Sequence, residues 1–202
     1  MMRDWINTAA RRVPTWPLYI VLTLPAVAWL YLGLTGGLGV EPIKALEQEL
    51  GEFALKLLIL GLCITPLRRF AGVNLLKFRR MLGLMAFAYV AMHLLVWLVL
   101  DVQILSQIWA DVLKRPYITV GMAAFILMIP LAVTSNAWSI RRLGPAWRRL
   151  HKLTYLVCLL GALHFVLLAK GFQIEPLVYL AVVAILVSLR FLPTPRRRAS
   201  AA

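Results

Sequence analysis

The sequence contains few charged residues and very few acidic ones. Only 15% of its 202 residues are charged, with 22 Lys and Arg against 8 Asp and Glu, while 62% are hydrophobic. Soluble globular domains are about a quarter charged and about half apolar, so this composition argues against an ordinary soluble domain and against a disordered chain. The mean hydropathy of +0.83 indicates an integral membrane protein instead.

Motifs for nucleotide chemistry are also missing. The 12 glycines form neither G-x-G-x-x-G nor G-x-x-x-x-G-K, which argues against a dinucleotide fold and a phosphate-binding loop. The two cysteines, Cys63 and Cys158, lie in apolar stretches without a second Cys or a His at metal-ligand spacing. We interpret them as buried apolar side chains rather than as a disulfide or a zinc site. Any redox chemistry must therefore take its nucleotide chemistry from a partner.

What the sequence does contain is six apolar blocks. They are separated by charged residues or by Pro and Gly, and they cover residues 17–34, 53–67, 81–100, 117–134, 150–169 and 176–192. Most reach about 17 residues, the lower limit for crossing hydrocarbon. The first block lacks a small-x-small cleavage site, so we interpret it as a retained helix rather than a secretory signal. We predict an all-α integral membrane protein with a cytoplasmic segment 1–16, a six-helix transmembrane bundle 17–192 and a cytoplasmic tail 193–202.

The basic residues predict how this bundle is oriented. Seventeen Lys and Arg fall on one side of the six spans, in the segments 3–12, 68–80, 141–152 and 190–198, and five fall on the other side together with seven of the eight acids. The positive-inside rule then puts both termini in the cytoplasm and requires an even number of spans. Topology therefore explains the net charge of +14 without a nucleic-acid partner.

Two of the three histidines are expected at one depth. His93 lies thirteen residues beyond Arg80 on the third span, and His164 lies thirteen residues beyond His151 on the fifth. At a helical rise of about 1.5 Å per residue, both imidazoles lie about 20 Å from the cytoplasmic ends of their spans. Imidazoles from two helices at one level can fill both axial positions of a haem iron. We therefore predict a haem between His93 and His164 that transfers electrons.

Other interpretations of these residues stay open. Each imidazole could hydrogen-bond a neighbouring helix, or the pair could form a proton relay, although a relay needs carboxylates in mid-membrane and every Asp and Glu is expected near the end of a span. Tyr89 and Trp97, four residues either side of His93, share its helix face and would line a porphyrin. Gly121 would let a macrocycle or another helix approach.

His151 and Arg79 are expected on the cytoplasmic side. His151 could ligate a second haem in the inner half, contribute to a flavin or quinone site, or face water. Arg79 lies fourteen residues before His93 and within about 40° of it around the helix axis, whereas Arg80 lies about 140° from His93 around that axis. Arg79 is therefore expected to approach an inner haem through its propionates, unless it is simply a positive-inside anchor.

Several motifs together resemble a known family. They are TPLRR (65–69), RRMLGLMAFAYVAMH (79–93), KRPYITVG (114–121), LAVTSNAW (131–138) and LGPAWRRLHKLTY (143–155) followed by His164. In this order they are similar to the MsrQ family, formerly YedZ, the haem-binding membrane subunits of the bacterial periplasmic methionine sulfoxide reductase system. The similarity runs from about residue 17 to residue 192.

The resemblance implies a six-helix ferric-reductase-like domain of the bacterial inner membrane, related in architecture to the membrane part of NADPH oxidases. It implies haem b with His93 and His164 as ligands, His151 as the third family histidine, and FMN at a site that no residue here identifies. It also implies a periplasmic molybdopterin reductase as partner, with membrane quinone or a cytoplasmic flavin reductase as electron donor. Arg79 stands where the oxidases have a fourth histidine, so one haem and two haems are both open.

The functional hypothesis is an electron-transfer subunit that does not itself reduce the sulfoxide. Two alternatives from other classes are a proton-coupled transporter that uses His93 and His164 as a relay, and a membrane anchor without redox activity. Haem absorption separates the transporter from the first hypothesis. Loss of the partner's electron supply on replacing all three histidines separates the anchor from it.

Overall fold

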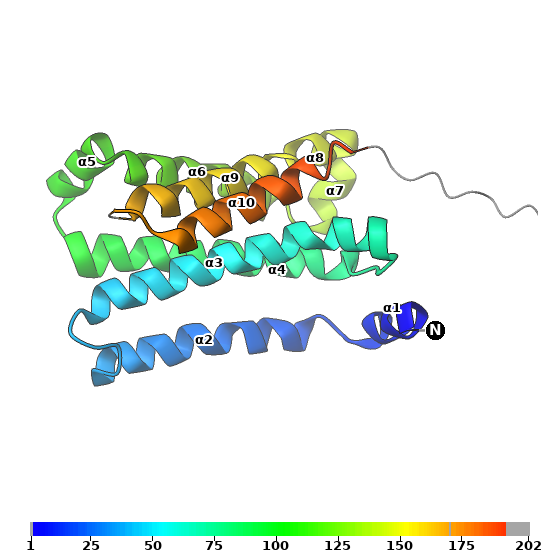
Figure 1. Ribbon diagram of the computed structural model, residues 1–202, viewed down its shortest axis with the longest axis horizontal. Coiled ribbons are helices and arrows are strands. Elements are labelled where there is room, and N and C mark those ends of the chain that lie inside the picture. Colours follow the sequence, from blue (N-terminus) through cyan, green and yellow to red (C-terminus); the bar gives the residue numbers. More distant parts are fainter. Residues whose placement is uncertain (1, 170, 193–202) are drawn as a thin grey trace, which may run out of the picture.

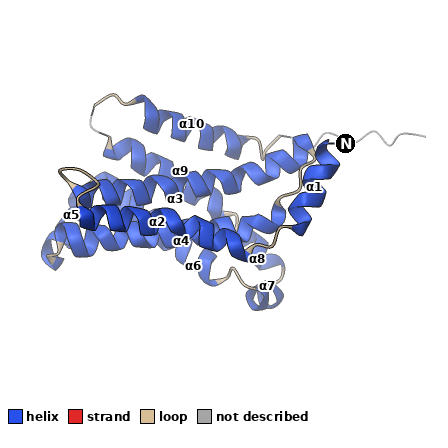
Figure 2. Cartoon of the chain, turned by 90° about the horizontal axis from the view of Figure 1, so that it is seen from below, coloured by secondary structure: helices blue, strands red, loops and turns tan. Residues whose placement is uncertain are grey.

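A computed structural model describes residues 2–169 and 171–192, and within these ranges all regular structure is helical (Figure 2). The predicted tail 193–202 lies outside the described residues. Five long helices and one shorter helix run side by side along the length of the molecule (Figure 1). They are α2 (Trp16–Thr35), α3 (Pro42–Pro66), α4 (Arg79–Val96), α6 (Pro116–Val133), α9 (Leu153–Leu168) and the shorter α10 (Ile174–Ser188).

Short helices connect or extend the long ones. They are α1 (Met2–Arg12), η1 (Leu67–Ala71), η2 (Leu76–Phe78), η3 (Trp97–Val102), α5 (Leu105–Lys114), α7 (Ala137–Leu143) and α8 (Pro145–Leu150). With these extensions, five helical stretches among the described residues are long and apolar enough to cross a membrane: Trp16–Thr35, Pro42–Ala71, Leu76–Val102, Pro116–Val133 and Pro145–Leu168. They match the first five predicted spans in order.

The sixth predicted span, 176–192, corresponds to α10. This helix is apolar but has only 15 residues, so it is about 22 Å long where the hydrocarbon core of a bilayer is about 30 Å thick. The count of six membrane-crossing helices therefore stays a prediction.

The second span begins far earlier than its predicted start at residue 53. Proline at the first helical position opens α3 at Pro42, because the missing N–H of Pro is not needed there. The polar residues between 44 and 52 hid this start from the sequence pattern. One stripe of this stretch is nevertheless buried, with Leu46, Leu50 and Ala54 recurring at a spacing of four residues.

The long helices pack as two pairs. α3 lies along α4, α6 lies along α9, and α10 covers α9. The core contains small and large apolar side chains from all of these helices, including Ala86, Ala162 and Val183, which are fully buried. The histidine-bearing helices α4 and α9 each belong to a different pair, so a site between them joins the two pairs.

α2 is attached to the bundle through one buried tyrosine. The Tyr89 hydroxyl donates to the carbonyl oxygen of Leu22 at 2.6 Å and accepts from the backbone N–H of Ala26 at 3.2 Å. Its ring also contacts those of Trp29 and Phe53. Tyr89 therefore points its hydroxyl at α2, whereas the sequence analysis expected it to line a porphyrin.

The two ends of the bundle carry different short helices and loops. α1, α7 and α8 lie at the same end as the last turn of α10, and α5 and the α2–α3 loop lie at the opposite end (Figure 1). Figure 2 shows α1 running across the ends of the long helices. The Lys77 ammonium donates to the carbonyl oxygens of Arg11 and Val13, which fixes the turn from α1 into α2.

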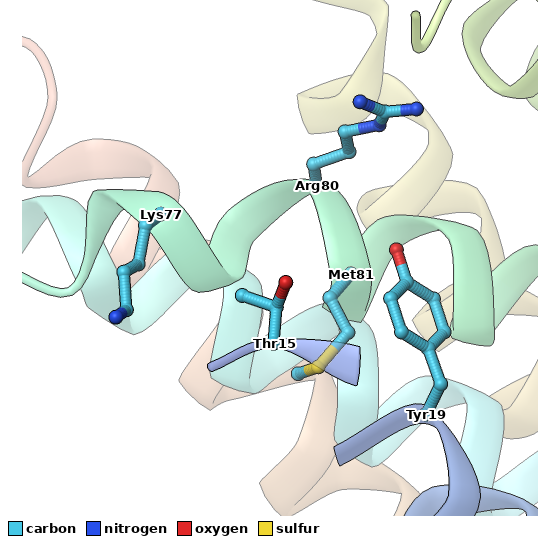
Figure 3. Close-up of a pocket in the computed structure, with 5 residues that line it drawn as sticks. All are labelled: Thr15, Tyr19, Lys77, Arg80 and Met81. Carbon is cyan, nitrogen blue, oxygen red and sulfur yellow. The ribbon is translucent and has the colours of Figure 1, made fainter. Parts of the chain in front are cut away.

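A shallow groove of about 580 Å³ lies beside this turn, lined by Thr15, Tyr19, Lys77, Arg80 and Met81 (Figure 3). The Arg80 side chain extends away from Thr15 and Lys77 in this view. Lys77, which lines this groove, is the residue that bonds to the chain just before α2. The groove therefore lies beside the contact between the N-terminal segment and the start of α4.

Candidate functional site

His93 and His164 come together from the two helix pairs. His93 lies in the last turns of α4 and His164 in the second half of α9. Their ring centroids are 6.2 Å apart, and the ring planes are nearly perpendicular at 82°. The two residues that sequence counting placed at one depth are therefore neighbours.

Each imidazole is held by a backbone carbonyl of the other helix in its pair. His93 Nδ1 lies 2.8 Å from the carbonyl oxygen of Glu47 in α3, and His164 Nδ1 lies 2.6 Å from that of Tyr117 in α6. A carbonyl oxygen only accepts hydrogen bonds, so each Nδ1 carries the proton and donates. Nε2 of both rings is then left unprotonated, which is the form that binds a metal ion.

A glycine lets each ring approach its helix this closely. Gly51 follows Glu47 by four residues, and a Cβ there would lie 3.0 Å from His93 Nδ1. Gly121 follows Tyr117 by four residues, and its Cβ would lie 2.8 Å from His164 Nδ1. Real Cβ atoms almost never come as close as the contact at Gly121, so a larger residue there would displace the His164 ring, whereas at Gly51 the His93 ring would have to shift by a few tenths of an ångström.

The two halves of the site repeat each other along the chain. In each, the residue whose carbonyl accepts the hydrogen bond is followed four residues later by glycine, and the histidine comes 46 or 47 residues after that residue. The sequence analysis had singled out Gly121 but missed Gly51 and this repeat. The spacing between glycine and histidine, 42 and 43 residues, is the signal that would have revealed it.

The donor set fits a haem better than a bare metal ion. Within residues 2–169 and 171–192, no group of three His, Cys, Asp or Glu side chains could hold a metal. Zinc sites need three or four protein ligands, whereas a porphyrin supplies four nitrogens and needs only two axial ones. An imidazole nitrogen lies about 2 Å from a metal that it binds, so ring centroids 6.2 Å apart would leave room for one iron atom held by both rings.

Carboxylates lie closer to this site than the sequence analysis expected. Because α3 starts at Pro42, Glu47 and Glu52 flank the level of Gly51 and His93 within a membrane-length helix. Glu52 forms an ion pair with Lys56 at 2.6 Å and accepts a hydrogen bond from the Tyr179 hydroxyl at 3.1 Å. The expectation that every acid lies near the end of a span stays a prediction, with Glu47 and Glu52 in the first half of α3.

His151 lies elsewhere, at the start of the helical stretch that carries His164. Thirteen residues along a helix separate the two by about 20 Å. The Thr134 hydroxyl donates to the carbonyl of Pro130 at 2.6 Å, so it accepts from His151 Nε2, 3.0 Å away. The imidazole also stacks on Trp147, with ring centroids 3.9 Å apart.

His151 and Arg79 line one cavity in the basic half of the bundle. Its volume is about 430 Å³. Arg80 lines it as well, and Arg80 also lines the groove beside Thr15 and Lys77, which Arg79 does not. Arg79 also donates to the Thr65 hydroxyl on α3. The sequence analysis missed Arg190, which reaches the same cavity from the last helix.

The chain is similar in sequence to known membrane proteins. Residues 50–162 match the model of the ferric reductase like transmembrane component family. Relatives named protein-methionine-sulfoxide reductase heme-binding subunit MsrQ occur in Agrobacterium fabrum strain C58, at 52% identity, and in Rhizobium meliloti strain 1021, at 53%. Each alignment covers 176 residues, 87% of this chain and 82% of the relative. The Brucella anthropi protein of the same name is 45% identical over 185 residues, 91% of this chain and 84% of its own. No solved structure matches.

Proposed function

Because this chain belongs to the MsrQ family of ferric reductase-like transmembrane proteins, we propose that it is a haem b electron-transfer subunit of the bacterial inner membrane. It passes electrons to a periplasmic molybdopterin enzyme that reduces methionine sulfoxide in oxidised envelope proteins. The observation that carries this proposal is the pair of imidazoles 6.2 Å apart, each with Nδ1 held by a main-chain carbonyl.

His93 and His164 are the proposed axial ligands of the haem iron. Their Nδ1 hydrogen bonds keep both rings in the tautomer that binds metal through Nε2 and prevent either ring from turning away. A haem held by both His93 and His164 would have no coordination position left for a substrate, so it would supply electron transfer rather than chemistry on a bound substrate. Sulfoxide reduction accordingly belongs to the partner.

We propose a single haem rather than two. His151 uses Nε2 to donate to Thr134, and the cavity that it lines offers Arg79 where a second imidazole would be needed. His151 is therefore not assigned as an iron ligand, and Arg79 is not assigned to propionates. Electrons enter from the basic end of the bundle, from membrane quinone or a cytoplasmic flavin reductase. FMN, which the resemblance implies, is not accounted for by His93 and His164, since an imidazole pair offers no phosphate-binding group.

The geometry speaks against a proton relay. A relay imidazole must gain a proton at one ring nitrogen and release one at the other. Here Nδ1 of each ring points at a carbonyl, which cannot carry a proton onward. Glu52, one of the two carboxylates that flank the level of His93, is already paired with Lys56.

Histidine replacement with measurement of bound haem tests the proposal. His93→Ala and His164→Ala should each lower the ratio of haem to purified protein and abolish the bis-imidazole spectrum, because the iron loses an axial ligand. His151→Ala, a matched replacement on the same helical stretch as His164, should keep the haem. The pyridine haemochrome assay gives the ratio, and size-exclusion chromatography shows that each variant is folded.

Unchanged haem content and spectrum in both the His93→Ala and His164→Ala proteins would reject the ligand assignment. Loss of half the haem in His151→Ala would instead establish a second haem. If the sulfoxide reductase keeps its electron supply with all three histidines replaced, the chain is an anchor and not an electron carrier.

A further inference from the structure

The short helix α5 carries an apolar stripe that the described part of the chain leaves uncovered. Leu105, Trp109 and Leu113 are 80%, 68% and 68% exposed. They recur every fourth residue, so they lie on one face of this ten-residue helix. Single exposed apolar residues are ordinary on a protein surface, but three large ones next to each other on one helix face mark a contact surface. A partner or a lipid therefore covers this stripe.

The side chains of α5 fall into three sectors around the helix axis. At about 100° per residue, the apolar stripe spans about 80°. The sector on one side of the stripe meets α6 and η3 and holds the half-buried residues Ile108, Asp111 and Val112. The sector on the other side holds Ser106, Gln107, Ala110 and Lys114. One face of α5 thus contacts protein, the next is apolar and exposed, and the third is largely polar.

This order of sectors suits a helix that lies in the surface of a membrane beside a transmembrane bundle. Such a helix meets the bundle on one side, hydrocarbon on the next and water on the third. The stripe also continues the surface that the spans present to lipid, because the residues that lead into α5 include the exposed Val99, Leu100 and Ile104. Tryptophan is enriched at the level of lipid headgroups, as expected for Trp109 in this position. A soluble partner would need a polar rim on every side of the stripe, and α5 provides one on a single side.

We propose that α5 lies in the plane of the membrane, with Leu105, Trp109 and Leu113 inserted among the lipid headgroups and the first carbons of the acyl chains. Figure 1 shows α5 at the end of the bundle opposite α1, α7 and α8. The leaflet that it contacts is therefore the one nearer the imidazole pair. The inference goes beyond the proposed function, because its partner is a phospholipid surface and neither a donor nor an acceptor of electrons.

The inserted helix also restrains the start of α6. Asp111 forms an ion pair with Arg115 at 3.0 Å, and Arg115 donates a hydrogen bond to the Tyr117 hydroxyl at 3.1 Å. The carbonyl oxygen of Tyr117 accepts the hydrogen bond from His164 Nδ1. The lipid contact of α5 therefore helps to hold the turn that positions this imidazole. This second effect rests on the proposed function of His164.

Spin labels on introduced cysteines test the insertion, with the full-length protein in phospholipid nanodiscs. Labels at Leu105→Cys, Trp109→Cys and Leu113→Cys should be accessible to oxygen, which concentrates in hydrocarbon, and should lose the power-saturation response to a water-soluble nickel chelate. Gln107→Cys, on the polar sector of the same helix, is the matched control and should keep that response. The native cysteines are buried or half-buried, so the unmodified protein gives the background.

Two results would overturn the insertion. An equal response of all four labels to the nickel chelate would show that the stripe faces water. Protection of the three stripe labels only after the sulfoxide reductase is added would show that α5 binds a soluble protein instead of lipid.

Replacing the three stripe residues together tests the effect on His164. In nanodiscs, the variant with Leu105→Ser, Trp109→Ser and Leu113→Ser should bind haem about tenfold more weakly, as is typical when a group that positions a ligand is disturbed. The variant with Leu105→Ile, Trp109→Phe and Leu113→Ile keeps the stripe apolar and should restore the affinity. Equal affinities of the serine variant and the unmodified protein would overturn the restraint on α6. The spin-label result does not depend on haem, so it stands even if the ligand assignment of His164 fails.

Discussion

Gly51 and Gly121 control how closely the two imidazoles approach the helices behind them. Both rings are fixed by hydrogen bonds to carbonyls one helical turn before a glycine. A methyl group at Gly121 would lie 2.8 Å from His164 Nδ1 and 3.0 Å from the neighbouring ring carbon. The methyl would meet the ring itself rather than a flexible chain end, so the imidazole would have to move.

Gly121→Ala should therefore reduce haem binding. The displaced ring loses its bond to the Tyr117 carbonyl and with it the fixed position of Nε2, and positioning groups of this kind typically change metal affinity by about 10- to 100-fold. Haem titration of the protein prepared without haem measures the affinity. Gly51→Ala, where the contact would be 3.0 Å, should have the same effect to a smaller degree.

Gly161→Ala provides the matched control on α9. A Cβ at Gly161 would meet only Leu55 Cδ1 at 3.9 Å, an ordinary contact, so this variant should bind haem normally. Equal haem affinities for the Gly121→Ala and Gly161→Ala proteins would show that haem binding does not need the close approach of the His164 ring to α6.

The sequence predicts the two histidines but not what holds them. A helix has a constant rise, so counting thirteen residues from a charged boundary was enough to put His93 and His164 at one level. The Glu47 and Tyr117 carbonyls are backbone groups that any residue type provides, and therefore they leave no compositional signal. Gly51 was missed because its stretch of α3 was interpreted as a loop.

At the level of helices, the attachment of α2 depends on a hydroxyl. Pro25 lies inside α2 and has no N–H, which disturbs the hydrogen bonding of the helix at this turn. The Tyr89 hydroxyl bonds to both the Leu22 carbonyl and the Ala26 N–H there. α2 is otherwise among the least buried of the long helices, with Ala26 as its one buried residue.

Tyr89→Phe should lower the stability of the protein without lowering its haem affinity. It removes the two hydrogen bonds between the fully buried Tyr89 hydroxyl and the backbone of α2, which costs about 0.5 to 1.5 kcal/mol for each bond. The midpoint of thermal unfolding, followed by size-exclusion chromatography of heated samples, should fall. Tyr31→Phe, which changes a tyrosine of α2 that is 65% exposed, should leave the midpoint unchanged. A normal midpoint for Tyr89→Phe would mean that apolar packing alone attaches α2.

The sequence pattern located the spans well where they are uniformly apolar and poorly where one face carries charge. α2 and α6 were predicted to within one residue at each end, since they contain no charged side chain. The first half of α3 carries Lys44, Glu47 and Glu49, and its buried stripe of leucines occupies only one helix face. A search for an apolar block averages over all faces and does not detect such a stripe.

For the molecule as a whole, the end of the bundle that carries most of the short helices is also the end where most basic residues are expected. α1, α7, α8 and the end of α10 gather at one end of the bundle, which is the end where seventeen of the 22 basic residues are expected (Figure 1). The positive-inside rule predicts that this end is cytoplasmic. In this predicted orientation the cavity with Arg79 and Arg190 would lie on the cytoplasmic side, and the imidazole pair would lie nearer the opposite face of the membrane.

Labelling of single cysteines with a membrane-impermeant maleimide measures this orientation. Val40, in the α2–α3 loop, is 99% exposed, and Arg141, on α7, is exposed at the opposite end. In intact spheroplasts Val40→Cys should react fully, while Arg141→Cys should react only after the membrane is permeabilised. The native Cys158 is buried and Cys63 half-buried, so the unmodified protein gives the background. The reverse pattern would put the imidazole pair on the cytoplasmic side, and haem at that depth could not be the last carrier before a periplasmic reductase.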